Sequence, residues 1–413
     1  MYLWKRETGS PALFQQKLNC EGTLMKIPYE QLSPKEALET YCEWIMEQLP
    51  QYDELTIFSW YRVFYPLRVL LLGSKLLDKP HYAEAAWRQM DRYLPEQLPN
   101  GAFCAYFRNK PTAEMTQKEI EDLFRTGNLN LADNGSNVHG LLLGAAVADP
   151  ERRERYIAAA RKFLDWYVPV WSLPDGSYGN GIWAGQKLNA PYTMAINVCS
   201  AFAQCTLLTG DRHYIENAER FAMFQCDNWH PCGVPVRFNL YPVPDSHNLV
   251  GDYSRIFYLL EGLIWTHYVS RDQAVRSRIE ERLTEWLEKD LLKRWPENRN
   301  WFDMNKATLR HIPHGDYGDS GHDIVGFYWM AAKCGGIPHL LKYYLKHIED
   351  RPEWRMRVER GEKFLCNPLN ARTLAVMAEE VEPVFCFQAT GFAGLSVAAA
   401  MDLDSIFPDL EKK

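Results

Sequence analysis

Acidic and amide side chains gather at several places where a polar loop runs into an apolar segment. The first is Leu131–Gly140, which contains Asp133, Asn137 and His139. A carboxyl group there can transfer a proton to or from a bound substrate, and its amide and imidazole neighbours can bind substrate hydroxyls. Helix capping is the alternative role, because Asp and Asn satisfy free N–H groups at a helix start. The sequence leaves both roles open.

A second acidic group lies in segment 315–327, where three Asp and one His crowd into a loop and the first turn of the following helix. Like charges brought together in a cleft raise one another's pKa, so a carboxylic acid can stay protonated near neutral pH and donate a proton. Asp323 is the best placed of the three, with His322 as its nearest polar neighbour. Capping and a solvated acidic loop are the alternatives.

A third group opens another apolar segment and consists of His247, Asp252, Tyr253 and Arg255. Arg255 can clamp a carboxylate bidentately, and Arg237 in the preceding loop can join it. A salt bridge between Arg255 and a nearby Asp is the alternative. The sequence leaves both roles of Arg255 open, the salt bridge and the binding of an acidic substrate.

Aromatic residues are frequent, at 13% of the chain, and two of them flank a loop. Segment 174–183 reads as a tight turn in which Gly supplies positive φ. Its Tyr178 and Trp183 can form a platform on which a sugar ring stacks, although packing in the core is the default role of such rings.

Composition excludes several classes of function. A net charge of −7 without a long Lys/Arg block argues against nucleic acid. The 11 His and 10 Cys show no HExxH and no paired ligand spacing, and no phosphate loop or nucleophile elbow occurs, so we expect neither metal nor cofactor. Without a leader or an apolar run of about 20 residues, the chain is predicted to be cytoplasmic, with reduced thiols and no membrane partner.

Two kinds of helical segment alternate six times along the chain. Segments that are apolar on most faces, as inner helices must be, are 56–76, 133–147, 190–209, 250–269, 321–335 and 388–402. Amphipathic segments, suited to an outer ring, are 34–49, 79–94, 151–168, 212–228, 272–290 and 338–349. This pattern predicts an all-α fold, an (α/α)6 toroid of six helical hairpins.

The links between these segments are unequal. Inner-to-outer links are short, with Gly or Asp for helix ends and caps, whereas outer-to-inner links are long and rich in Gly, Pro and Asn. The site is therefore expected at the face with long loops, near the starts of the inner helices. We expect one catalytic domain over 1–413, with 1–33 as an N-terminal extension and short strands in the loops, for example at 234–238. An open α-solenoid is the structural alternative.

The six-hairpin plan, with junctions such as TGDRHYIENAERFA at 209–222, resembles the six-hairpin glycosidase superfamily over nearly the whole chain. Segment 133–138, DNGSNV, resembles the Asp-Asn-x-x-Asn helix start of the unsaturated glucuronyl hydrolases, which implies that Asp133 is the catalytic acid/base. His322-Asp323 resembles that family's other His-Asp segment, although it follows the catalytic Asp here, and the family's Trp-rich Arg-Gly segment is not evident.

Together these features predict a glycoside hydrolase acting on short oligosaccharides that contain uronic acid. Asp133 would be the general acid/base with Asp323 or Asp252 as partner, while Arg255 and Arg237 would hold the substrate carboxylate. The alternatives are an epimerase of the N-acylglucosamine 2-epimerase type, a polysaccharide lyase and a non-catalytic glycan-binding toroid. Sugar identity, linkage, hydration or direct hydrolysis, exo or endo action and oligomeric state, a homo-oligomer included, stay open.

Overall fold

The computed structural model describes residues 32–50, 59–108, 110–183, 185–230, 234–235, 253–286 and 383–402, with positions 288, 345, 352 and 366. The described helices and strands belong to the unit Leu32–Lys413, and the other unit, Met1–Gln31, lies outside the described residues. The single catalytic domain over 1–413 with an extension at 1–33 stays a prediction.

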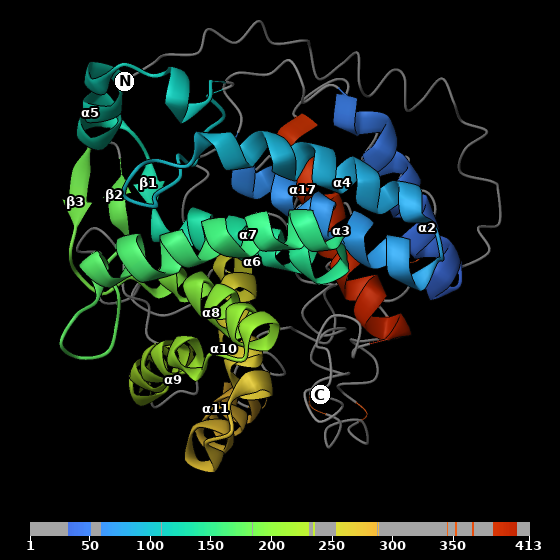
Figure 1. The fold of residues 1–413 in the computed structure, drawn as a ribbon. Helices are drawn as coiled ribbons and strands as arrows, with labels where there is room; N and C mark the ends of the chain where they lie inside the picture. The colour runs from blue at the N-terminus through green and yellow to red at the C-terminus, as the bar shows by residue number, and fades with distance from the viewer. Residues whose placement is uncertain are drawn as a thin grey trace, which may run out of the picture. The chain divides into compact units, whose positions relative to one another are not determined.

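Inner and outer helices alternate along the described chain (Figure 1). The inner helices are α3 (Trp60–Leu76), α6 (Leu131–Val147), α8 (Asn197–Thr209), α10 (Tyr253–Val269) and α17 (Pro383–Met401). The outer helices are α2 (Pro34–Gln48), α4 (Pro80–Tyr93), α7 (Pro150–Lys162), α9 (Arg212–Asp227) and α11 (Gln273–Trp286). The predicted helix at 321–335 lies outside the described residues, as does the one at 338–349 except for position 345.

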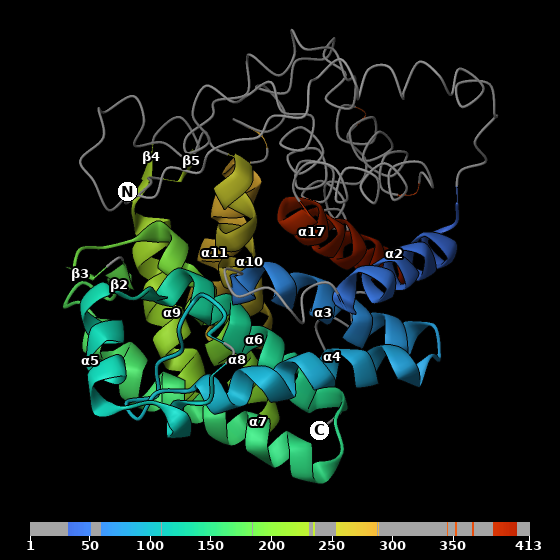
Figure 2. The ribbon, with the colours of Figure 1, turned by 90° about the horizontal axis from the view of Figure 1, so that it is seen from above.

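Contacts between the inner helices follow the order of the chain. α3 packs on α6, α6 on α8, and α8 on α10, while α17 returns to pack beside α3 and α2 (Figure 2). This succession is the one that the alternating pattern predicts for an (α/α)6 toroid.

Glycines allow the inner helices to approach one another closely. A Cβ at Gly135 of α6 would lie 2.7 Å from the backbone N of Val198, and one at Gly391 of α17 would lie 2.6 Å from Cβ of Tyr65. Side chains at these positions would push the helices apart. The Gly-rich inner segments are therefore explained by helix packing within the ring.

Short links between inner and outer helices are capped as the sequence predicts. Gly210 ends α8 with φ +76°, and Asp211 then accepts a hydrogen bond from His213 N at 3.1 Å. Asp149 caps α7 by accepting a hydrogen bond from Arg152 N at 2.9 Å. These caps satisfy N–H groups that would otherwise be free at the helix starts.

The longer links contain small elements. Strands β1 (Leu129–Asn130), β2 (Gly181–Trp183) and β3 (Gln186–Leu188) form an antiparallel sheet, and β4 (Trp229–His230) pairs with β5 (Val234–Pro235). Helix α5 (Gln117–Thr126), which the sequence analysis did not predict, begins at a capping box formed by Thr116 and Glu119. The predicted short strands in the loops are thus confirmed, and β5 begins at the predicted residue Val234.

None of the described helices is both long enough and apolar enough to cross a membrane.

Candidate functional site

The start of α6 is fixed by the small sheet that precedes it. Leu131 N donates to Asn180 O at 2.9 Å, and Ala132 N donates to Asn180 Oδ1 at 3.1 Å. β1 approaches β2 closely at Gly181, which has φ +83° and whose Cβ, if present, would lie 2.6 Å from Leu129 O. The loop side of α6 is therefore held in place by backbone geometry that requires glycine.

Asn130, rather than Asp133, caps α6. Its Oδ1 accepts a hydrogen bond from Asp133 N at 2.7 Å, and its Nδ2 donates to Asp133 Oδ2 at 2.8 Å and to Asn128 Oδ1 at 3.0 Å. Among the described residues, Asn130 is thus the hydrogen-bond partner of one carboxylate oxygen of Asp133. Because Asn130 satisfies the free N–H group, the Asp133 carboxyl is not needed as the cap.

The environment of Asp133 suits proton transfer near neutral pH. Burial raises the pKa of the half-buried Asp133 carboxyl from its ordinary value of 3.8 to about 6, against the opposing effects of the Asn130 hydrogen bond and the Arg62 charge. A carboxyl with such a pKa is populated in both protonation states near neutral pH, as a general acid/base requires.

Two residues of α3 accompany Asp133. Arg62 Nε donates to the Tyr61 hydroxyl at 3.0 Å, and its guanidinium lies 5.6 Å from the centre of the Tyr61 ring. Burial raises the pKa of Tyr61 and the Asp133 charge adds to the increase, so both α3 residues lie within electrostatic reach of the carboxyl. Tyr61 and Arg62 are not among the site residues predicted from the sequence, although they open an inner helix as Asp133 does.

Asn137 lies on α6 but faces an outer helix. It is fully buried, and its Nδ2 donates to the Tyr93 hydroxyl of α4 at 3.3 Å. That hydroxyl donates to Asn134 Oδ1 at 3.2 Å. The expected contact of Asn137 with substrate is therefore corrected, because the side chain joins α6 to α4.

His139 is fully buried beside another inner helix. Its ring lies edge-to-face against Trp265 of α10, with centroids 4.8 Å apart. Burial, with the Arg68 charge as a smaller cause, lowers the pKa of His139 well below its ordinary value, so the imidazole is neutral. We correct its assignment as a substrate contact, because no part of the ring is exposed.

The two residues of the predicted aromatic platform, Tyr178 and Trp183, differ in exposure. Tyr178 is 2% exposed, its ring centroid lies 5.4 Å from that of Phe221, and its hydroxyl donates to Asn217 Oδ1 at 3.3 Å. Tyr178 is therefore a core residue and is not available for stacking. Trp183 is half-buried in β2. The predicted turn before it is confirmed by Gly176, which has φ +89°.

The side chains of the remaining predicted site residues lie outside the part of the chain that the structure describes. Positions outside the described residues are Arg237, His247, Asp252, His322 and Asp323. Tyr253 and Arg255 lie in the first turn of α10, as the sequence predicts, but their side chains are also outside the described set.

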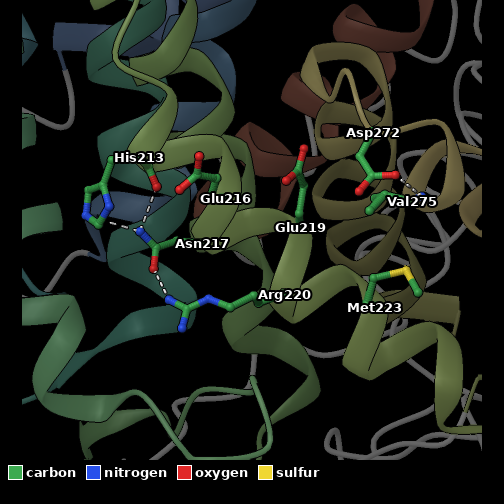
Figure 3. A pocket seen from close by; sticks show the side chains of 8 residues that line it. All are labelled: His213, Glu216, Asn217, Glu219, Arg220, Met223, Asp272 and Val275. Carbon is green, nitrogen blue, oxygen red and sulfur yellow. Dashed lines mark hydrogen bonds between the residues drawn. The ribbon is translucent and has the colours of Figure 1, made fainter.

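A groove of about 520 Å³ lies on the outer helices α9 and α11 (Figure 3). Its polar groups support the local fold: Glu219 Oε1 accepts from Ser270 Oγ at 2.6 Å, and Asp272 Oδ1 caps α11 by accepting from Ala274 N at 2.8 Å. Within the described ranges, no group of three His, Cys, Asp or Glu side chains is arranged to hold a metal ion. The groove therefore offers no catalytic arrangement comparable to that at Asp133.

Comparison with known proteins finds similarity in structure alone. No family model and no curated protein matches the chain. An unsaturated glucuronyl hydrolase specific for heparin is 9% identical with a TM-score of 0.53, over 90% of this chain and 98% of that one. Dfg5 from Chaetomium thermophilum in complex with glucosamine is 13% identical with a TM-score of 0.56, over 91% and 93%.

A polysaccharide lyase is 14% identical with a TM-score of 0.51, over 89% of this chain and 98% of that one. These likenesses show the fold alone: the chain has an (α/α)6 toroid, as its alternating helices predict.

Proposed function

We propose that the protein is a sugar-processing enzyme, a glycoside hydrolase that acts on short oligosaccharides containing uronic acid. The observation that carries this proposal is Asp133, a half-buried carboxyl at the start of α6 whose pKa is raised to about 6. Perturbed carboxyl pKa values gather at catalytic sites because acid/base chemistry needs them. Asp133 is therefore assigned as the general acid/base.

In direct hydrolysis, protonated Asp133 gives its proton to the glycosidic oxygen as the bond from that oxygen to the anomeric carbon breaks. Water then supplies the oxygen that becomes bonded to the anomeric carbon. Its proton goes to a second carboxylate in inversion, or to the Asp133 carboxylate in retention, where the second carboxylate has first formed and then releases a bond to that carbon. A second carboxylate is needed, and the sequence offers Asp252 or Asp323. Their separation from Asp133 decides between retention and inversion.

Recognition of the uronic acid is assigned to arginine. The Arg62 charge acts on the Asp133 carboxyl, and a guanidinium binds a carboxylate with two parallel hydrogen bonds. Arg237 and Arg255 are further candidates from the sequence. A positive group at this place would draw the acidic sugar ring toward the catalytic carboxyl.

The structural likenesses support sugar chemistry. The compared structures with TM-scores of 0.51 to 0.56 are a polysaccharide lyase, an unsaturated glucuronyl hydrolase and a protein holding glucosamine. All three concern saccharides and share the fold of this chain. Fold alone hosts several reactions, so the choice of hydrolysis rests on Asp133.

The substrate class is tested by mass spectrometry of products from matched disaccharides, saturated and 4,5-unsaturated uronyl sugars against their neutral glucosyl counterparts. We expect the wild type to cleave uronyl substrates preferentially, and Arg62→Met to lose about 10-fold or more of that preference. Equal cleavage of neutral and uronyl sugars by the wild type would contradict the uronate assignment. Absence of cleavage across the panel would contradict the hydrolase.

A further inference from the structure

A buried ion pair joins two inner helices that are not neighbours in the ring. Arg68 of α3 donates from Nη2 to Oε1 of Glu261 on α10, and the side chains are 2% and 7% exposed. Between α3 and α10, the succession of packed helices passes through α6 and α8. The pair therefore ties the first helical hairpin to the fourth.

Tyr65 completes this connection. Its hydroxyl donates to Glu261 Oε2 at 3.0 Å, and the Arg68 guanidinium lies 5.0 Å from the centre of the Tyr65 ring. We call Tyr65, Arg68 and Glu261 the axial cluster. Both carboxylate oxygens of Glu261 are held by α3, from side chains one helical turn apart, so the cluster fixes the rotation of α3 about its own axis.

Stability alone is a poor explanation for the axial cluster. Moving the two charged side chains from water into the protein interior costs several kcal/mol for each ion, and the attraction between the two ions often only offsets this cost. Replacement of a buried ion pair by apolar side chains of similar volume is often neutral or stabilising. A buried pair of this kind is best understood through the geometry that it imposes.

The rotation of α3 also affects the surroundings of Asp133, because α3 packs against α6. The two helices meet where a Cβ at Gly140 of α6 would lie 3.5 Å from Cδ of Arg68, and Tyr61 and Asp133 precede this contact by seven residues each. The Asp133 charge accordingly acts on Tyr61. The two helices therefore face each other at two levels, and the rotation of α3 decides where Arg62 lies relative to Asp133.

We propose that the axial cluster is a positioning device: it holds α3 in the rotation that keeps Arg62 beside the Asp133 carboxyl. The proposal rests on the proposed function only for the catalytic role of Asp133. In the described part of the chain, the titratable groups that face this carboxyl are Arg62 and Tyr61 of α3 and Tyr93 of α4. Helices α8 and α7 also pack on α6. α8 has no Asp, Glu, Lys, Arg or His, and the charged helix α7 meets α6 through Tyr156 at Gly144, eleven residues after Asp133.

The test uses Tyr65→Phe and Glu261→Gln in the full chain. The pKa of Asp133 is measured by carbon-13 carboxyl NMR, with its signal assigned from Asp133→Asn. We expect either variant to raise this pKa by about 0.5–1, because the Arg62 charge that favours the ionised carboxyl is no longer held in place. The matched control is Ile279→Ala, which removes buried apolar volume on the outer helix α11, an element that contributes no residue to the cluster.

An unchanged Asp133 pKa in both cluster variants would overturn the proposal, as would an equal increase in the control Ile279→Ala. On a sugar that the wild type cleaves, we also expect Tyr65→Phe to lower kcat about 5- to 10-fold with little change in KM. If the wild type cleaves no sugar, the proposed function fails, while the titration still decides whether the cluster positions Arg62.

Discussion

Replacing Asp133 by Asn should make the protein more stable at neutral pH while removing its activity. The pKa of the Asp133 carboxyl lies at about 6 instead of 3.8 because burial penalises the charged form. Each pH unit of that difference is worth about 1.4 kcal/mol, so ionised Asp133 lowers the free energy of unfolding by up to about 3 kcal/mol. Asn resembles the protonated acid and can still accept the hydrogen bond from Asn130 Nδ2.

The difference in stability between wild type and Asp133→Asn should depend on pH in a defined direction. A folded-state pKa above the unfolded value means that the folded protein binds the proton more tightly, so stability is greatest where the carboxyl is protonated. Below about pH 4 the carboxyl is protonated in both states, and wild type and Asp133→Asn should differ little in the free energy of unfolding. Between about pH 4 and 6 the wild type should lose stability relative to the variant, and above pH 6 the difference should be constant.

Urea unfolding of both proteins from pH 3.5 to 8 measures this difference. The control is Asp149→Asn, because capping hydrogen bonds lower the pKa of the exposed Asp149, so that variant should be less stable than the wild type at pH 8. A variant Asp133→Asn that is less stable at pH 8, or whose gain is the same at every pH, would refute the reasoning about burial.

Three further substitutions follow from the packing and the caps. Gly135→Ala should lower the free energy of unfolding by about 1–3 kcal/mol in urea, because its Cβ would lie 2.7 Å from Val198 N; a loss below a few tenths would contradict the close helix contact. Asn130→Ala should cost about 1 kcal/mol and raise the pKa of Asp133 in an NMR titration, since the cap and its hydrogen bond are lost; an unchanged pKa would argue against that bond. Tyr178→Phe should leave kcat/KM for a cleaved sugar within about twofold of the wild-type value, because the Tyr178 side chain is buried in the core; a 10-fold loss would show that Tyr178 does contact the substrate.

The periodic elements were predictable because their signal is local. Segment 133–147 is apolar on most faces and lies within α6, Leu131–Val147. Helix α5 was missed since none of its residues is fully buried, so it lacks the apolar run that marks a core helix. Its capping box, Thr116 with Glu119, is a local signal that the sequence does contain and that could have marked the start of α5.

The candidate site was predictable only in part. Asp133 was found because an Asp at the start of an apolar helix is a local pattern, but the cap at Asn130 depends on where the helix begins, which sequence places only within a few residues. Arg62 and Tyr61 were missed because their approach to Asp133 is a contact between α3 and α6. The burial of aromatic rings, which placed Tyr178 in the core, is likewise decided by tertiary packing.

The central claim is that Asp133 transfers the proton in sugar cleavage. The most direct test incubates wild type, Asp133→Asn and the cap variant Asp149→Asn with saturated and 4,5-unsaturated uronyl disaccharides and aryl glycosides, and measures the products by mass spectrometry. We predict cleavage by the wild type and by Asp149→Asn, with at least about a 100-fold lower rate for folded Asp133→Asn. Full turnover by Asp133→Asn would contradict the account.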